Sequence, residues 1–264
     1  MITRVSVEPS RRCSKGCAFC YNGSSPDGAD GWSADELVAF AEDCAKNGVE
    51  SLSIGGGEPL EYVGLYSVLA ALDGVLARTL TTNGILLEDP AALDRLVAAR
   101  PDKVHVSIHS PENPREVERA ATVVLALDAR GVHAGVNLLV RRSRLEDATR
   151  AYAALLSKGF TPGHIVLLPL RAEGERDTPS PEEVARVANG TRFQAMSCLS
   201  GCKKSERFAS IGYDKSAAWC SYTRSRRVLR SLEYRALVEA LDGLELERCA
   251  TGLVRLGAAR SVRE

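Results

Sequence analysis

The chain has 264 residues, which favours one large α/β unit over two full-sized domains. Its 34 basic and 34 acidic residues balance, which excludes a general nucleic-acid or polybasic membrane binder. No stretch approaches the roughly 20 apolar residues of a membrane helix, and no apolar secretory signal opens the chain, so we expect a cytoplasmic protein. The eight cysteines are unusual. In a reducing compartment, clustered cysteines favour metal or redox chemistry over disulfides.

Strand and helix patterns alternate along the chain to about residue 170. Short apolar runs predict strands at residues 2–7, 51–54, 79–82, 104–108, 134–140 and 165–168. Helical apolar spacing predicts helices at residues 33–47, 62–72, 90–99, 114–130 and 145–158. This alternation requires parallel strands joined by right-handed crossovers.

Six such strands fit a partial (β/α)6 barrel better than a closed eight-stranded barrel. We therefore predict an α/β fold in which residues 1–189 form the barrel and residues 190–264 form a C-terminal extension. The extension carries four cysteines, a basic run at residues 224–230 and little strand pattern.

Three cysteines, Cys13, Cys17 and Cys20, follow the first predicted strand. In a parallel barrel, the loops that follow the strands gather at the active face. Three neighbouring thiolates are able to bind three irons of one 4Fe-4S cluster, which leaves the fourth iron open. A zinc knuckle is the competing interpretation, but it requires a fourth N or S ligand close by, and none follows in the next twenty residues.

The pattern C-x3-C-x2-C, with the aromatic Phe19 before its last cysteine, resembles the signature of the radical S-adenosylmethionine (SAM) superfamily. Further segments resemble that family in step with the strand count: Gly56, Gly57 and Glu58, then Thr82 and Asn83, then Ser107 and His109, then Asn137. The resemblance implies that these residues bind SAM, with Glu58 accepting from its amino group. Taken alone, the glycines are also typical of a strand-to-helix turn, and Asn83-Gly84 of a type I′ turn.

The resemblance also implies the reaction. One electron, from a flavodoxin- or ferredoxin-type reductant, would reach the cluster and cleave SAM to methionine and a 5′-deoxyadenosyl radical. That radical would remove hydrogen from an unactivated C–H bond, while the protein positions the target carbon and excludes water.

The remaining cysteines fall into two groups. Cys44 continues the apolar face of its predicted helix, so we expect it in the core. Cys198, Cys202, Cys220 and Cys249 lie in the extension. Either all four bind an auxiliary 4Fe-4S cluster, or the first three bind it and Cys249 stays free as a catalytic hydrogen donor. Buried structural thiols are the simpler alternative.

The barrel motifs and Cys249 together resemble the radical SAM epimerases of aminoglycoside biosynthesis. That resemblance implies conversion of neomycin C to neomycin B, with C5‴ inverted when the Cys249 thiol returns hydrogen to the opposite face. A cationic sugar would need acidic partners, and the acidic residues expected at the active face are Asp27, Asp30, Glu112, Glu173 and Asp214. Any one of them is also typical of a solvated surface loop.

Two other classes of protein compete with the epimerase. One is a radical SAM enzyme with an auxiliary cluster that modifies a ribosomal peptide or another small molecule, in which Cys249 would be a cluster ligand. The other is an iron–sulfur electron carrier or a zinc-structured binding module. Such a protein would need neither the glycine–glutamate turn at residues 56–58 nor an open iron.

Overall fold

The computed structural model describes residues 1–171, 177–196, 199 and 204–246. Its first half comprises β1 (Arg4–Val7), α1 (Ala34–Lys46), β2 (Ser51–Ile54), η1 (Pro59–Glu61), α2 (Leu65–Ala71), β3 (Ala77–Thr82), η2 (Leu86–Glu88), α3 (Pro90–Ala98), β4 (Lys103–Ile108) and α4 (Pro114–Asp128). The second half comprises β5 (Ala134–Val140), η3 (Arg142–Arg144), α5 (Leu145–Ser157), η4 (Pro162–His164), β6 (Ile165–Pro169), α6 (Pro181–Val187), β7 (Gln194–Ala195), β8 (Phe208–Ile211), β9 (Ser216–Ala218), β10 (Arg227–Val228) and α7 (Tyr234–Leu241).

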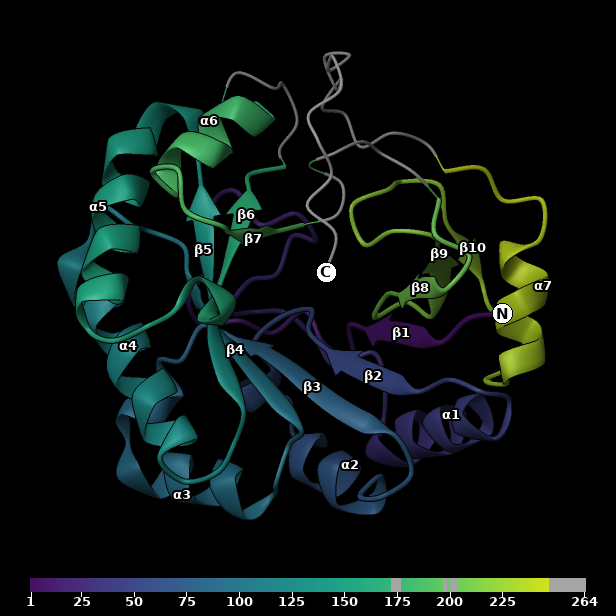
Figure 1. Cartoon of the computed structure of the whole chain (residues 1–264). Helices are drawn as coiled ribbons and strands as arrows, with labels where there is room; N and C mark the ends of the chain where they lie inside the picture. Colours follow the sequence, from purple (N-terminus) through teal and green to yellow (C-terminus); the bar gives the residue numbers. More distant parts are fainter. Residues whose placement is uncertain (172–176, 197–198, 200–203, 247–264) are drawn as a thin grey trace.

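The described strands form one sheet of ten, in the order β10-β9-β8-β1-β2-β3-β4-β5-β6-β7. Strands β1 to β6 pair in parallel with their neighbours in chain order, which confirms the predicted α/β partial barrel. Figure 1 shows the sheet curving around an open centre, with α1 to α5 on its outer side. The loops that follow β1 to β5 therefore meet on one side of the barrel, at the carboxyl ends of the strands.

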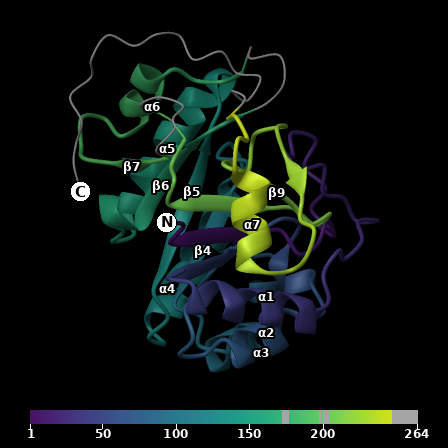
Figure 2. The ribbon, with the colours of Figure 1, turned by 90° about the vertical axis from the view of Figure 1, so that its right-hand side faces the viewer.

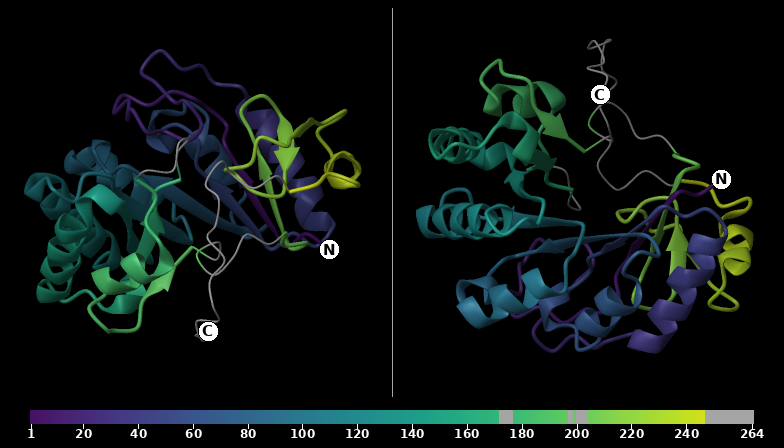
Figure 3. Two further views of the ribbon diagram at one scale, coloured as in Figure 1. Left: turned by 90° about the horizontal axis from the view of Figure 1, so that it is seen from above. Right: turned by 60° about the horizontal axis from the view of Figure 1, so that its bottom comes forward.

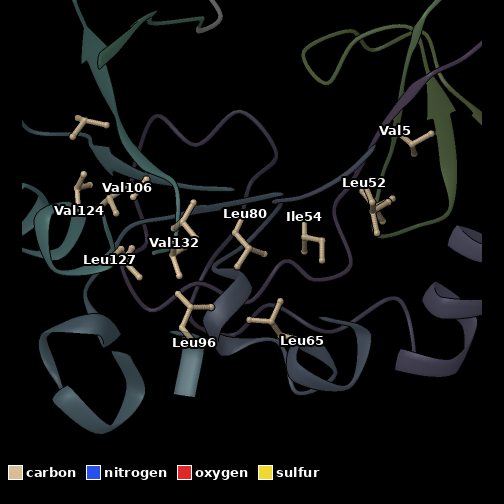
Figure 4. Close-up of a cluster of buried hydrophobic side chains, with 14 of the residues drawn as sticks. Val5, Leu52, Ile54, Leu65, Leu80, Leu96, Val106, Val124, Leu127 and Val132 are labelled. Atoms are coloured by element: carbon tan, nitrogen blue, oxygen red, sulfur yellow. The ribbon is translucent and has the colours of Figure 1, made fainter. Parts of the chain in front are cut away.

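The core lies between the sheet and these helices, and Figure 4 shows part of it. Leu80 of β3 and Leu96 of α3 are at most 1% exposed. Every residue of β5 is buried, as expected for a parallel strand covered on both faces. The sheet is thus a rigid base for the loops at its edge.

Helix α1 shows how far local sequence determines these elements. Ser33 caps it as predicted: its hydroxyl accepts from Glu36 N at 3.1 Å, and Glu36 Oε2 accepts from Ser33 N at 2.9 Å. Cys44 is 1% exposed on the buried face, which confirms the expected core position. None of the described helices is long and apolar enough to cross a membrane.

The residues beyond 190 add strands to both edges of the sheet. β7 pairs with β6, while β8 pairs in parallel with β1, and β9 and β10 continue that edge in antiparallel fashion. Helix α7 packs beside β9 and α1, as Figures 2 and 3 show. The sequence analysis missed these strands, and three of them, β7, β9 and β10, have only two or three residues, which is too short to display alternation.

Candidate SAM and cluster site

A cavity of about 360 Å³ opens at the carboxyl ends of the parallel strands. Its lining includes every residue expected to bind the cluster or SAM: Cys13, Cys17, Phe19, Cys20, Gly56, Gly57, Glu58, Thr82, Asn83, Ser107, His109 and Asn137. These residues come from β3, β4 and β5 and from the loops after β1, β2, β3 and β4. The fold therefore brings into one cavity motifs that are up to 124 positions apart in the sequence.

The loop that carries the three cysteines folds back on itself. Cys13 N donates to Ser25 O at 2.9 Å, and Arg11 N donates to Ala29 O at 3.0 Å. Burial raises the pKa of the Cys13 thiol, against the backbone N–H groups of Lys15 and Gly16, which lower it. All three thiols are partly buried at the cavity.

The donor set fits a 4Fe-4S cluster. Three thiols from one short loop face one cavity, and thiolates are the ligands that such clusters use. Among the described residues, no three His, Cys, Asp or Glu side chains converge on a single metal ion. The ligands of a cluster have no need to converge in that way, because each binds a different iron.

The glycine segment after β2 packs directly against the cysteine loop. Gly57 N donates to Ser10 O at 2.8 Å, and Glu58 N donates to Arg12 O at 2.7 Å. A Cβ on Gly57 would lie 2.1 Å from Arg12 O, and Gly56 has a positive φ of 94°. The glycines thus allow the two backbone segments to approach closely. The N–H groups of Gly57 and Glu58 donate the hydrogen bonds that join these segments.

Glu58 links the loop after β2 to the loop after β3. Its Oε1 accepts from Thr82 Oγ1 at 2.6 Å, and its Oε2 accepts from Asn83 N at 2.8 Å. Burial raises the pKa of this carboxyl to about 7, although hydrogen bonds from Asn83, Thr82 and Leu60 act in the opposite direction. The residue is 2% exposed, and its carboxylate holds the Thr82–Asn83 turn against the cavity.

The ends of β4 and β5 supply the next polar residues. Ser107 and Asn137 are 4% and 8% exposed, and they lie side by side in the β4–β5 register. Burial lowers the pKa of His109 to about 4. Its Nδ1 lies 3.1 Å from Lys15 Nζ, which is consistent with a neutral imidazole that accepts from the ammonium group.

Several lining residues escaped sequence reasoning, namely Lys15, Tyr21, Arg171, Met196 and Tyr222. Lys15 lies between Cys13 and Cys17, but the motif is defined by the spacing of its cysteines and says nothing of the residues between the first two of them. Met196 and Tyr222 belong to the extension, and the ring of Tyr222 lies 4.7 Å from that of Tyr21. The extension therefore forms part of the cavity wall.

Four of the five acidic residues expected to hold a cationic substrate lie outside the described lining of the cavity. Asp27, Asp30, Glu112 and Asp214 are absent from the described lining of the cavity, and Glu173 lies outside the described residues. Asp214 Oδ1 instead accepts from Ser216 Oγ at 2.6 Å and from Ser216 N at 3.1 Å in the β8–β9 turn. Asp30 accepts from Ser10 Oγ at 2.7 Å within the cysteine loop. The geometry of these four residues gives no support to a substrate-binding role.

Of the cysteines expected in the extension, the structure describes Cys220. Cys198, Cys202 and Cys249 lie outside the described residues. Cys220 Sγ accepts from Tyr222 N at 3.5 Å, and Tyr222 lines the cavity. The segment around Cys220 therefore adjoins the site, and the auxiliary cluster and the hydrogen donor stay predictions.

Comparisons with known proteins show what this sequence is similar to. A probable GTP 3′,8-cyclase of Methanopyrus kandleri is 26% identical over 259 residues, covering 94% of this chain and 76% of that protein. An AdoMet-dependent heme synthase of Methanosarcina barkeri is 26% identical over 195 residues, covering 69% of this chain and 56% of that protein. The expected likeness to aminoglycoside epimerases gains no support from these relatives.

The fold also has a counterpart among solved structures. SuiB of Streptococcus suis, bound to S-adenosylmethionine, superposes with a TM-score of 0.73 at 14% identity, over 92% of this chain and 67% of that one. A model of the radical SAM superfamily matches residues 7–180, more than half of the sequence. This match includes the three cysteines and each of the polar segments expected to bind SAM. The chain belongs to the radical SAM superfamily.

Proposed function

We propose that Cys13, Cys17 and Cys20 hold the 4Fe-4S cluster of a radical SAM enzyme and that SAM binds beside it. The observation that carries this proposal is the single cavity, in which the three thiols face Glu58, Asn83 and the other polar ends of β3 to β5. When bound, the reduced cluster and SAM supply the means to remove a hydrogen atom from an unactivated C–H bond.

The chain's own residues bind the cluster and SAM and form the wall of the cavity around them. The thiolates bind three irons, and the polar residues from the loop after β2 to strand β5 bind SAM. Glu58 keeps the Thr82–Asn83 turn in place. It is also the only acidic side chain in the described lining of the cavity, so its carboxylate is the acceptor available to the ammonium group of SAM. Leu139, Leu168 and Leu170 line the same cavity and make part of its wall apolar.

We propose further that the substrate binds where the extension meets the cavity, beside Met196 and Tyr222. The names of the relatives, a GTP cyclase and a heme synthase, favour modification of a small molecule, and SuiB has also been solved with a precursor peptide. Aminoglycoside epimerisation with Cys249 as hydrogen donor is the narrower proposal. Its main support is the resemblance of the sequence.

The cluster assignment is tested by Cys17→Ala. We predict that, after anaerobic reconstitution, this variant holds several-fold less iron than the wild type, because one of the three ligands is lost. It should also form no 5′-deoxyadenosine from SAM. Iron content, the EPR spectrum of the reduced protein and chromatography of the nucleoside products measure the effect.

Cys44→Ala is the matched control, because Cys44 is a buried cysteine of α1 outside the cavity. It should keep the iron content and SAM cleavage of the wild type. Equal losses from the two variants would contradict the assignment of Cys17 as a ligand.

Turnover in D2O separates the narrower proposal from the broader one. Reconstituted protein, SAM and neomycin C should give neomycin B with one deuterium at the inverted carbon if a solvent-exchangeable thiol returns hydrogen. SAM cleavage without conversion of neomycin C would leave the radical SAM assignment intact and reject the epimerase. GTP in a parallel reaction tests the activity named for the cyclase relative.

A further inference from the structure

Lys15 lies between two of the proposed cluster ligands, yet its side chain turns inward. It is 14% exposed and lines the cavity. Its Nζ lies 2.6 Å from Glu116 Oε1 and 3.1 Å from His109 Nδ1. A lysine in an exposed loop would ordinarily extend into solvent, so this inward position calls for a physical explanation.

Glu116, in the first turn of α4, explains it. Its side chain is 5% exposed, and Oε1 also accepts from His109 N at 2.6 Å and from Ser110 N at 3.3 Å. One carboxylate oxygen thus joins the cysteine loop, the segment after β4 and the start of α4. Because Glu116 is buried and Lys15 is largely so, the loss of either partner would leave a poorly compensated charge.

The same helix carries a contrasting ion pair. Glu118 lies 2.7 Å from Lys158, but these two side chains are 61% and 34% exposed. Exposed pairs of this kind contribute little to stability. Glu118 therefore provides a control for Glu116 on the same helix.

We propose that the Lys15–Glu116 ion pair is a positioning pair, which holds the three-cysteine loop in place and cancels the charge that either side chain alone would put beside the cluster. The inference rests on the proposed ligand role of Cys13, Cys17 and Cys20. Ser14 and Phe19 provide further anchors: Ser14 Oγ donates to Glu61 at 2.6 Å, and Arg141 lies 5.3 Å from the Phe19 ring. The Ser14 bond is exposed, whereas the Lys15–Glu116 pair is largely withdrawn from solvent.

The test compares Lys15→Met, Glu116→Gln and the control Glu118→Gln, all as full-length reconstituted protein. Deuterium uptake by a peptide spanning the cysteine loop should be about tenfold faster in the first two variants and unchanged in the control. Potentiometry followed by EPR should show the cluster harder to reduce in Lys15→Met and easier to reduce in Glu116→Gln. The signal to follow is the one that changes when SAM is added.

These opposite shifts are the sharper measurement, because mere loosening would expose the cluster to solvent in both variants and move both potentials in the same direction. Shifts in one direction, or exchange and potentials equal to those of Glu118→Gln, overturn the inference. For a variant that takes up no cluster, loop exchange is compared with the cluster-free wild type: faster exchange supports the inference, and unchanged exchange overturns it. Failure of the wild type to take up a cluster would reject the proposed function instead.

Discussion

Glu58 couples the charge of the site to folding. Burial raises its pKa from 4.5 to about 7. Because the folded pKa lies above the unfolded one, its contribution to the free energy of unfolding is fully present below about pH 4.5 and is lost as the pH rises through about 7. We predict that Glu58→Gln removes this pH dependence, which amounts to about 3 kcal/mol for a displacement of this size.

Urea unfolding of the cluster-free chain across this pH range measures the effect. Glu112→Gln, a substitution of an exposed glutamate in the loop after β4, is the control and should follow the wild type. Parallel pH curves for the wild type and Glu58→Gln would show that the Glu58 carboxyl has no such role.

At the residue level, sequence reasoning found those side chains whose spacing forms a motif. Cys13, Glu58 and Asn137 all line the cavity that the structure shows. Lys15 and Tyr222 also line it but belong to no spacing pattern, because their positions follow from contacts with α4 and with Tyr21 across the fold. The acidic substrate residues were chosen by loop position alone, and loop position does not say which way a side chain turns.

At the level of elements, the contact between the β2 loop and the cysteine loop is open to a direct test. We predict that Gly57→Ala lowers the free energy of unfolding by about 1–3 kcal/mol, because its Cβ would overlap Arg12 O, which lies 2.1 Å away. The displaced cysteine loop should also take up less iron. Urea unfolding and iron analysis provide the two measurements.

Gly55→Ala is the matched control two positions earlier, because a Cβ there meets no atom within 4 Å. Its unfolding midpoint should stay near that of the wild type. If both substitutions proved equally harmless, the close packing of the two loops would not limit stability.

The barrel elements were largely predictable from local signals. Ser33 begins α1 as its cap, and β2 spans the residues that the apolar run predicted. Helix α2 is shorter than expected: residues 62–64 form a turn that ends at the N-cap Gly64, so the helix begins only at Leu65. Where a cap or a long apolar run exists, local chemistry determines the element.

At the level of the whole molecule, the extension shares one sheet with the barrel, so we expect a substitution in the extension to destabilise the barrel as well. Leu237 of α7 is fully buried, so we predict that Leu237→Ala costs about 2–5 kcal/mol. Because β8 pairs with β1, amide exchange in β1 should become faster as well. Denaturant unfolding combined with hydrogen exchange measures both effects.

Val238→Ala is the control at the next position of the same helix, where the side chain is 43% exposed. It should change the free energy of unfolding by no more than about 0.5 kcal/mol. An early transition in Leu237→Ala that leaves β1 protected would mean that the extension unfolds independently of the barrel.

The union of extension and barrel was not predictable from the sequence. The pairing of β8 with β1 joins Arg4 to Phe208, and no periodicity reports contacts over such a separation. The composition of the segment, rich in cysteine and basic residues, instead suggested a separate appendage. Only the sheet order shows that the extension supplies the strands at both edges of the same sheet.

This pairing also governs the order in which the chain can mature during translation. β1 is translated before both of its neighbours and can pair with β2 early, but its other edge lacks β8 until residues 208–211 have emerged from the ribosome. An open edge strand is a template for pairing with other chains. Until β8 pairs with it, the nascent polypeptide therefore carries an unpaired strand edge immediately before the loop with the three cysteines, so that chaperone protection at this stage would favour correct assembly.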